Sequence, residues 1–130
     1  MAASEDAVAA YRHRDRAAFE RIVDRVLDDL PDWVVDEIDN LHVVVQDYPT
    51  AHQAESGHNL LGLYEGVTKL DRGNDYFAAA PDRITIFRAS HLADARSAEA
   101  LEAQVRKTVL HELGHHLGID DDRLHEIGWG

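Results

Sequence analysis

The segment HELGHHLGIDD, residues 111–121, is the most informative stretch of this chain of 130 residues for predicting its fold. Apolar residues lead into it at intervals of four, which is the spacing of one buried face of an α-helix. They are Leu101, Val105, Val109, Leu113 and Leu117. We therefore expect a long helix from near Ser97 to Gly118, where a glycine can take the positive φ that ends a helix.

This helix carries the pattern HExxH. Side chains four residues apart lie on one helix face, so the imidazoles of His111 and His115 can both reach a single metal ion. Glu112 is rotated by roughly 100° around the helix axis, which suits a general base acting on a water held by that metal. After the turn at Gly118, Asp121 can supply an oxygen as the third ligand. Three protein ligands and an open position are typical of catalytic zinc.

Other polar residues near this pattern leave alternatives open. His116 points away from the pair by roughly 100°, so we interpret it as a packing or supporting residue. His125 is the alternative third ligand if the tail folds differently. Asp120 and Asp122 are expected to cap a short tail helix or to be solvated. The three consecutive aspartates, 120–122, lie at the negative end of the long helix, where a cation would relieve the unfavourable charge.

The remaining sequence predicts an α+β fold with N-terminal helices, a small mixed sheet of about three to four strands, and the HExxH helix. An amphipathic pattern predicts a helix that begins at Asp15 as N-cap and ends near Leu30. Pro31 begins a short second helix. Strands are expected at residues 41–46, 59–65 and 83–88. A loop is expected at residues 52–58, and a short tail helix at residues 123–127.

Within the second predicted strand, Gly62 indicates a bulge or a close approach of the backbone. Tyr64 and Glu65 are interpreted as an ordinary strand tyrosine and its solvated neighbour. Trp33 and Trp129 are expected to be core or tail-docking aromatics, and Trp129 could hold the metal-binding helix against the body of the protein.

Composition narrows the possible partners. Asp and Glu total 25 against 13 Lys and Arg, and the formal charge of −12 disfavours nucleic-acid and membrane partners. The absence of cysteine excludes disulfides, thiol catalysis and Cys-ligated zinc. With no apolar segment typical of a signal peptide or a membrane span, we expect one cytoplasmic domain over residues 1–130. The oligomeric state is left open.

Residues 105–128, preceded by the GLYEG and DRITIFR segments, resemble the small bacterial zincin-like metallopeptidase family. This family is a minimal zincin and was formerly a domain of unknown function. The resemblance implies zinc as cofactor, with His111, His115 and Asp121 as ligands and Glu112 as base. Unlike most metzincins, the chain has Asp as third ligand, and it lacks a Met-turn because Met1 is its only methionine.

The resemblance implies hydrolysis of peptide bonds through a metal-bound water that Glu112 activates, with a peptide or protein as substrate. Zincins commonly bind an extended peptide along an edge strand beside the metal. Residues 59–65 and 83–88 are both candidates for that strand. The alternative function is a zinc-stabilised binding module with little or no catalysis. A metal-dependent ribonuclease ranks last. The small bacterial RNA-processing family of similar size also has a histidine-rich helix, but that helix carries three histidines and lacks the Glu after the first.

Overall fold

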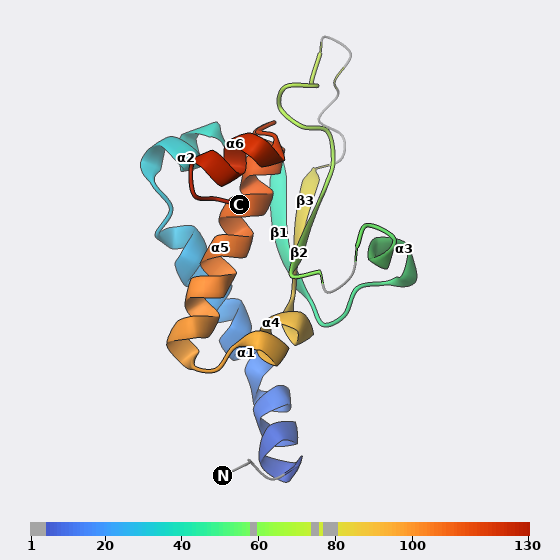
Figure 1. The fold of residues 1–130 in the computed structure, drawn as a ribbon, viewed down its shortest axis with the longest axis vertical. Coiled ribbons are helices and arrows are strands. Elements are labelled where there is room, and N and C mark those ends of the chain that lie inside the picture. The colour runs from blue at the N-terminus through green and yellow to red at the C-terminus, as the bar shows by residue number, and fades with distance from the viewer. Residues whose placement is uncertain (1–4, 58–59, 74–75, 77–80) are drawn as a thin grey trace.

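The computed structural model describes residues 5–57, 60–73, 76 and 81–130, with side chains from Arg16 onward. Its helices and strands form an α+β fold with a small mixed sheet, as predicted (Figure 1). They are α1 (Glu5–Asp28), α2 (Asp32–Glu37), β1 (Leu41–Gln46), α3 (Ala51–Ala54), β2 (Gly62–Glu65), β3 (Asp82–Phe87), α4 (Arg88–Asp94), α5 (Ala98–His116) and α6 (Asp121–Glu126).

The sheet has three strands in the order β1-β3-β2. β1 runs parallel to β3, whereas β2 runs antiparallel to it, with Gly62 opposite Ile86. The sheet is therefore mixed, as expected, and β2 forms one of its edges. Since β3 lies in the centre, the segment 83–88 cannot serve as the edge strand for an added peptide.

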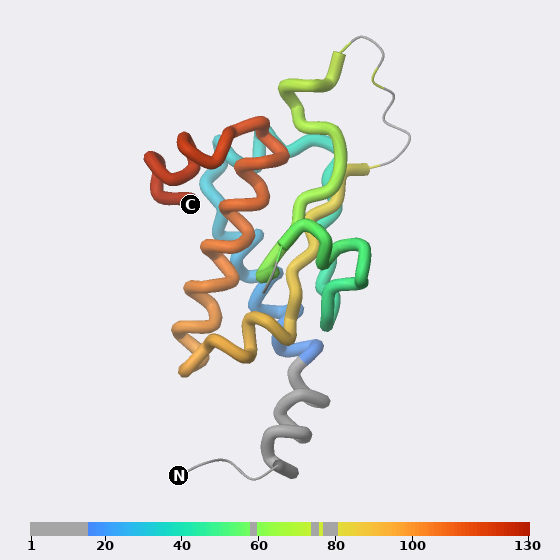
Figure 2. The backbone as a smooth tube through the Cα atoms, turned by 45° about the vertical axis from the view of Figure 1, so that its right-hand side comes forward, coloured from blue at the N-terminus to red at the C-terminus, as the bar shows by residue number. Residues whose placement is uncertain are grey.

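Helices α1 and α5 pack against each other, and α5 also lies against β2 and β3 (Figures 1 and 2). The predicted ladder on α5 is buried, and it meets Ile84 and Ile86 from β3. Each such side chain contributes roughly 1.5–3 kcal/mol on burial. The buried apolar core residues are Phe19, Val23, Val26, Leu30, Val34, Ile84, Ile86, Leu101, Val105, Val109 and Leu113. One face of α5 is thus anchored, which fixes where its polar face points.

The N-terminal helix differs from the prediction. It begins at Glu5, ten residues before Asp15, so the prediction that Asp15 is its N-cap is wrong. The residues that precede Asp15 are rich in Ala and include Arg12 and Arg14, which are good helix formers, and they extend the helix without an apolar stripe.

Smaller differences concern the connecting segments. The predicted loop 52–58 contains the one-turn helix α3, which Thr50 and Gln53 close with a reciprocal capping box. β3 is shifted by one residue from the prediction, because Arg88 begins the unpredicted helix α4. β2 begins at Gly62 rather than at residue 59, and residues 58–59 lie outside the described part of the chain. None of the helices described here combines the length and apolar character that crossing a membrane requires.

Candidate metal centre

Three of the residues singled out by the sequence come together at the C-terminal end of α5. One ligand atom from each of His111, His115 and Asp121 lies within 4.8 Å of the others. The two imidazole rings are 4.7 Å apart between centroids, and Nε2 of His115 lies 2.9 Å from Oδ1 of Asp121. Two imidazole nitrogens and one carboxylate oxygen form a donor set that zinc accepts. The residues present therefore fit the metal that the motif implies.

The backbone beyond α5 carries Asp121 back toward the histidines. Gly118 has a φ of +84°, as predicted for the residue that ends this helix. The amide of Ile119 donates to the carbonyl of Gly114 at 2.9 Å, which closes the turn. The side chain of Asp120 caps α6 by accepting from the amide of Arg123 at 2.8 Å. Since Asp120 is the cap, Asp121 does not have that role and its carboxylate faces His115 instead.

A close contact that sequence reasoning missed brings α6 onto α5. A Cβ placed on Gly114 would lie 2.1 Å from Cδ2 of Leu124, so only a glycine leaves room for this leucine. Figure 2 shows α6 folded back beside the end of α5. The available signal was a glycine inside an otherwise regular helical pattern, which usually has a packing reason.

The orientation of His111 is set by the backbone near the end of the chain. Its Nδ1 lies 2.9 Å from the carbonyl oxygen of Trp129. Because a carbonyl oxygen only accepts hydrogen bonds, Nδ1 is the donor, and the neutral ring then has its lone pair on Nε2. Histidine ligands are commonly oriented in this way by a partner at the second ring nitrogen.

Glu112 is buried, with 7% of its surface exposed, and its Oε2 lies 3.3 Å from Nδ1 of His115. The hydrogen bond with Glu112 is the main cause that raises the pKa of His115 to about 9. Burial opposes this shift, and Asp121 adds to it. The hydrogen bond between His115 and Asp121 in turn lowers the pKa of Asp121. The two carboxylates thus favour positive charge at this point of the structure.

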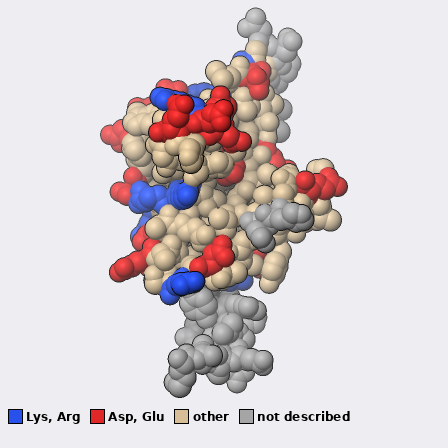
Figure 3. Space-filling model, viewed as in Figure 1, with Lys and Arg blue, Asp and Glu red and all other residues tan. Residues whose placement is uncertain are grey.

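Acidic side chains also gather over α6 on the face shown in Figure 3. The exposed acidic residues of this helix and its cap are Asp120, Asp121, Asp122 and Glu126. Their negative potential attracts cations toward the end of α5.

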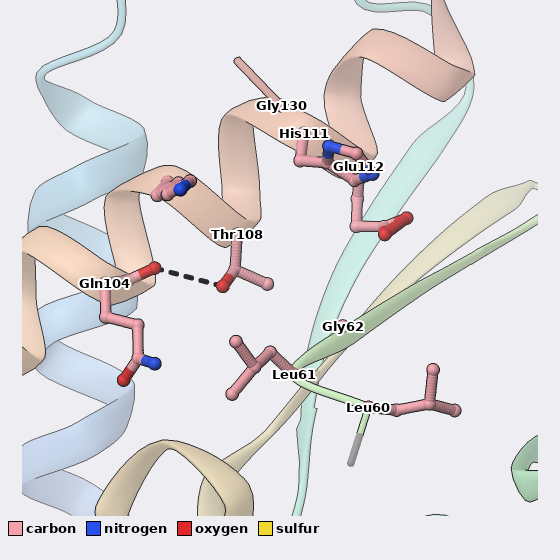
Figure 4. Close-up of a pocket in the computed structure, with 9 residues that line it drawn as sticks. Leu60, Leu61, Gly62, Gln104, Thr108, His111, Glu112 and Gly130 are labelled. Atoms are coloured by element: carbon pink, nitrogen blue, oxygen red, sulfur yellow. Dashed lines mark hydrogen bonds between the residues drawn. The ribbon is translucent and has the colours of Figure 1, made fainter. Parts of the chain in front are cut away.

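A groove of about 410 Å³ lies beside the cluster, between α5 and the chain that leads into β2 (Figure 4). Leu60 and Leu61 line it on one side, and His111 and Glu112 line it on the other. A Cβ on Gly62 would lie 2.6 Å from Cγ2 of Thr108 and 3.2 Å from Cγ of Glu112. The predicted close approach of the backbone at Gly62 is therefore confirmed, and it brings the edge strand next to Glu112.

His116 is fully buried, and its ring is directed away from the cluster of His111, His115 and Asp121. Its Nδ1 lies 2.9 Å from Oδ2 of Asp82, and its Nε2 accepts from the amide of Asp39 at 3.3 Å. Burial is the main cause that lowers the pKa of His116, which favours the neutral ring. The structure thus places His116 in a supporting position, as the sequence suggested.

Asp82 is the centre of a buried polar cluster that no local pattern revealed. Besides His116, it accepts hydrogen bonds from the hydroxyl of Tyr64 at 2.5 Å, from Arg72 at 2.8 Å and from the amide of Val67 at 3.1 Å. Burial acts to raise the pKa of Asp82, but these hydrogen bonds outweigh it and lower the pKa. Because its hydroxyl is bonded to Asp82, Tyr64 is a structural strand residue.

The structure also shows where His125 and the two tryptophans lie. His125 is exposed on α6 and is not among the three clustered donors in the described residues. Trp33 is 55% exposed, so of the two roles expected for it, core or tail-docking, the core one is excluded and the tail-docking one holds. Trp33 stacks on Trp129, which packs against the core. His13 and His58, to which no role was assigned, lie outside the side chains described.

The fold agrees with comparisons to known proteins. The chain belongs to the zincin-like metallopeptidase family, which matches residues 38–129, so the sequence resemblance is confirmed. Membership implies a metal, usually zinc, and a peptide or protein substrate. Among solved structures, the chain is similar to a conserved hypothetical protein from Thermus thermophilus. The two are 25% identical, the match covers 79% of this chain and 94% of that one, and the TM-score is 0.52. No curated protein matches.

Proposed function

We propose that this chain is a zinc-dependent metallopeptidase in which His111, His115 and Asp121 hold zinc and Glu112 is the general base. The observation that carries the proposal is the meeting of three metal donors with a buried glutamate at the side of a groove. When bound in such a site, zinc supplies Lewis acidity that polarises a substrate carbonyl and eases the deprotonation of water.

The residues of the chain supply the remaining chemistry. The carboxylate of Glu112 projects from α5 on the side of the groove (Figure 4), where it accepts a proton from water and then delivers it to the leaving amine. Its burial removes most solvent from around this side chain, which strengthens the electrostatic interactions of Glu112 itself. The carbonyl of Trp129 holds His111 in the tautomer that leaves Nε2 available.

The edge strand β2 supports a peptide as substrate. The amide of Phe87 donates to the carbonyl of Leu61, and such bonded pairs alternate along an antiparallel ladder. The backbone N–H and C=O groups of Gly62 and Tyr64 therefore point away from β3, toward the open edge of the sheet. An extended peptide can add to this edge with its backbone beside Glu112. Of the two strands that the sequence left open, this geometry favours residues 59–65.

The experiment compares the zinc-loaded chain with the variant Glu112→Gln on a peptide library of varied sequence, with cleavage followed by mass spectrometry. We expect the wild type to cut peptides and the variant to lose roughly 10²–10⁴-fold in kcat. Zinc content, measured by atomic absorption, should remain the same. Glu126→Gln, which changes an exposed glutamate on α6, is the control and should retain full activity.

Two results would contradict the proposal. Unchanged cleavage by Glu112→Gln would exclude this glutamate as the base. A chain that binds zinc and peptides but cuts none of them would instead be a metal-stabilised binding module.

A further inference from the structure

Trp33 and Trp129 form a stacked pair that joins the N-terminal helices to the end of the chain. Their ring centroids are 5.7 Å apart and the planes are inclined by 17°. Trp33 belongs to α2 and is 55% exposed, so it contributes little to the core. Trp129, in contrast, is partly buried and packs against the core. Packing of the core therefore does not explain why a tryptophan stands at position 33.

Three contacts hold Trp129, two through its backbone and one through its ring. Its amide donates to the carbonyl of Leu124 at 2.8 Å, its carbonyl accepts from Nδ1 of His111 at 2.9 Å, and its ring stacks on Trp33. The carbonyl direction follows from the backbone conformation, which the ring and the amide restrain from either side. A loss of the stack therefore frees the acceptor that orients His111.

We infer that Trp33 and Trp129 are positioning residues for His111, which keep a carbonyl on its Nδ1 so that Nε2 presents its lone pair to the metal. The inference rests on the proposed zinc site. A metal-binding histidine needs both the correct tautomer and the correct ring orientation, and the partner of its second nitrogen sets both. Trp33 lies before residues 38–129, so the family match does not include this contribution.

The first measurement is zinc affinity, by competition with a chromogenic chelator, for the wild type, Trp33→Ala, Trp129→Ala and the double variant. An aromatic stack contributes roughly 0.5–1.5 kcal/mol, so each single variant should bind zinc about two- to tenfold more weakly. The double variant should lose less than the product of the two single losses, because both remove the same contact. Trp33→Phe should recover most of the affinity.

Val35→Ala is the matched control, because Val35 is a half-exposed apolar residue on the same helix. It should bind zinc as the wild type does. Cobalt(II) absorption bands report the ligand geometry, and they should change in Trp33→Ala but not in Val35→Ala. A purely structural role of Trp33 would lower the melting temperature of the metal-free protein and leave these bands unchanged.

The second measurement needs no metal. The imidazole ¹⁵N shifts of His111 in the metal-free chain, at a pH where the ring is neutral, distinguish a proton on Nδ1 from one on Nε2. We expect Nδ1–H in the wild type and in Val35→Ala, and a mixture of tautomers in Trp33→Ala. The inference is overturned if Trp33→Ala keeps both the wild-type tautomer and the wild-type affinity, or if Val35→Ala loses as much. A wild type that binds no zinc refutes the proposed function, while the tautomer still decides the inference.

Discussion

Leu124 packs directly on Gly114, so closely that a Cβ at position 114 would lie 2.1 Å from Cδ2 of the leucine. Leu124 is completely buried by this contact and its surroundings. The contact determines how near α6 can come to α5. Because Asp121 is the first residue of α6, it also determines whether the carboxylate reaches His115.

We predict that Gly114→Ala displaces α6 and weakens both folding and zinc binding. Overpacking of a filled site destabilises a protein by about 1–3 kcal/mol, and the zinc affinity should fall as Asp121 moves away. Urea denaturation of the metal-free chain and a zinc titration would measure the two effects. Gly73→Ala is the control, since a Cβ at Gly73 meets no atom of the described residues within 4 Å. Equal stability and affinity in Gly114→Ala and the wild type would refute this account of the contact.

Replacement of the third donor should act on the metal alone. We predict that Asp121→Ala lowers zinc affinity by about a hundredfold or more, because a two-histidine site remains. The carboxylate is exposed, so the stability of the metal-free chain should change by less than about 0.5 kcal/mol. Asp122→Ala, at the next exposed residue, should leave zinc affinity unchanged. The prediction is wrong if the two variants bind zinc equally well.

Removal of metal should lower the thermal stability of the chain. Zinc at about a hundred times its dissociation constant contributes roughly 2.7 kcal/mol to folding, which corresponds to a shift of about 5–15 °C for a domain of this size. Circular dichroism melts with excess zinc and with excess chelator would measure it. In the variant that lacks both His111 and His115, replaced by alanine, the chelator should have no effect.

The cluster around Asp82 predicts a loss of stability in acid. The pKa of Asp82 in the folded chain lies below its usual value of 3.8. A carboxyl with a lowered pKa in the folded state stabilises the fold above its unfolded pKa, and this contribution disappears as pH falls through the folded pKa. The free energy of unfolding should therefore decrease below about pH 4.

Asp82→Asn tests the origin of that decrease. The variant removes the buried partner of Arg72, whose side chain is 8% exposed, while the ion pair of Arg72 with the exposed Asp39 remains. The free energy of unfolding should therefore fall by about 1.5–3 kcal/mol at pH 7, as for the loss of a hydrogen bond to a charged group. The difference from the wild type should shrink at pH 3, because the carboxyl of Asp82 in the unfolded wild type, with its usual pKa of 3.8, is then mostly protonated. Asp29→Asn removes an exposed ion pair with Arg106 and should change stability by less than about 1 kcal/mol at either pH. A constant difference across this pH range would exclude Asp82 as the titrating group.

The parts of the site that depend on local spacing could be predicted from the sequence. Residues four apart share a helix face, so the meeting of His111 and His115 follows from the pattern alone. The positive φ of Gly118 and the cap at Asp120 follow from residue type and position. These features need no information about distant segments.

The contacts between distant segments could not be predicted. Asp82 meets His116 only because β3 packs against α5, and a single aspartate at the start of a strand carries no sign of that partner. The stack of Trp33 on Trp129 joins residues 96 positions apart in the chain, and no periodicity connects them. The boundaries of α1 and the short helices α3 and α4 depend on capping and helix propensity, which an apolar pattern does not record.

The topology separates the metal-binding cluster from the strand that faces it. Both histidines, Glu112 and Asp121 lie within eleven consecutive residues, 111–121, whereas the open edge facing them comes from β2, far earlier in the chain. Under the proposed function, reactivity and recognition are thus encoded in separate stretches. A library randomised at the strand side chains other than Gly62 and Tyr64, which contact Glu112 and Asp82, should yield catalysts with altered selectivity while the residues of 111–121 stay the same.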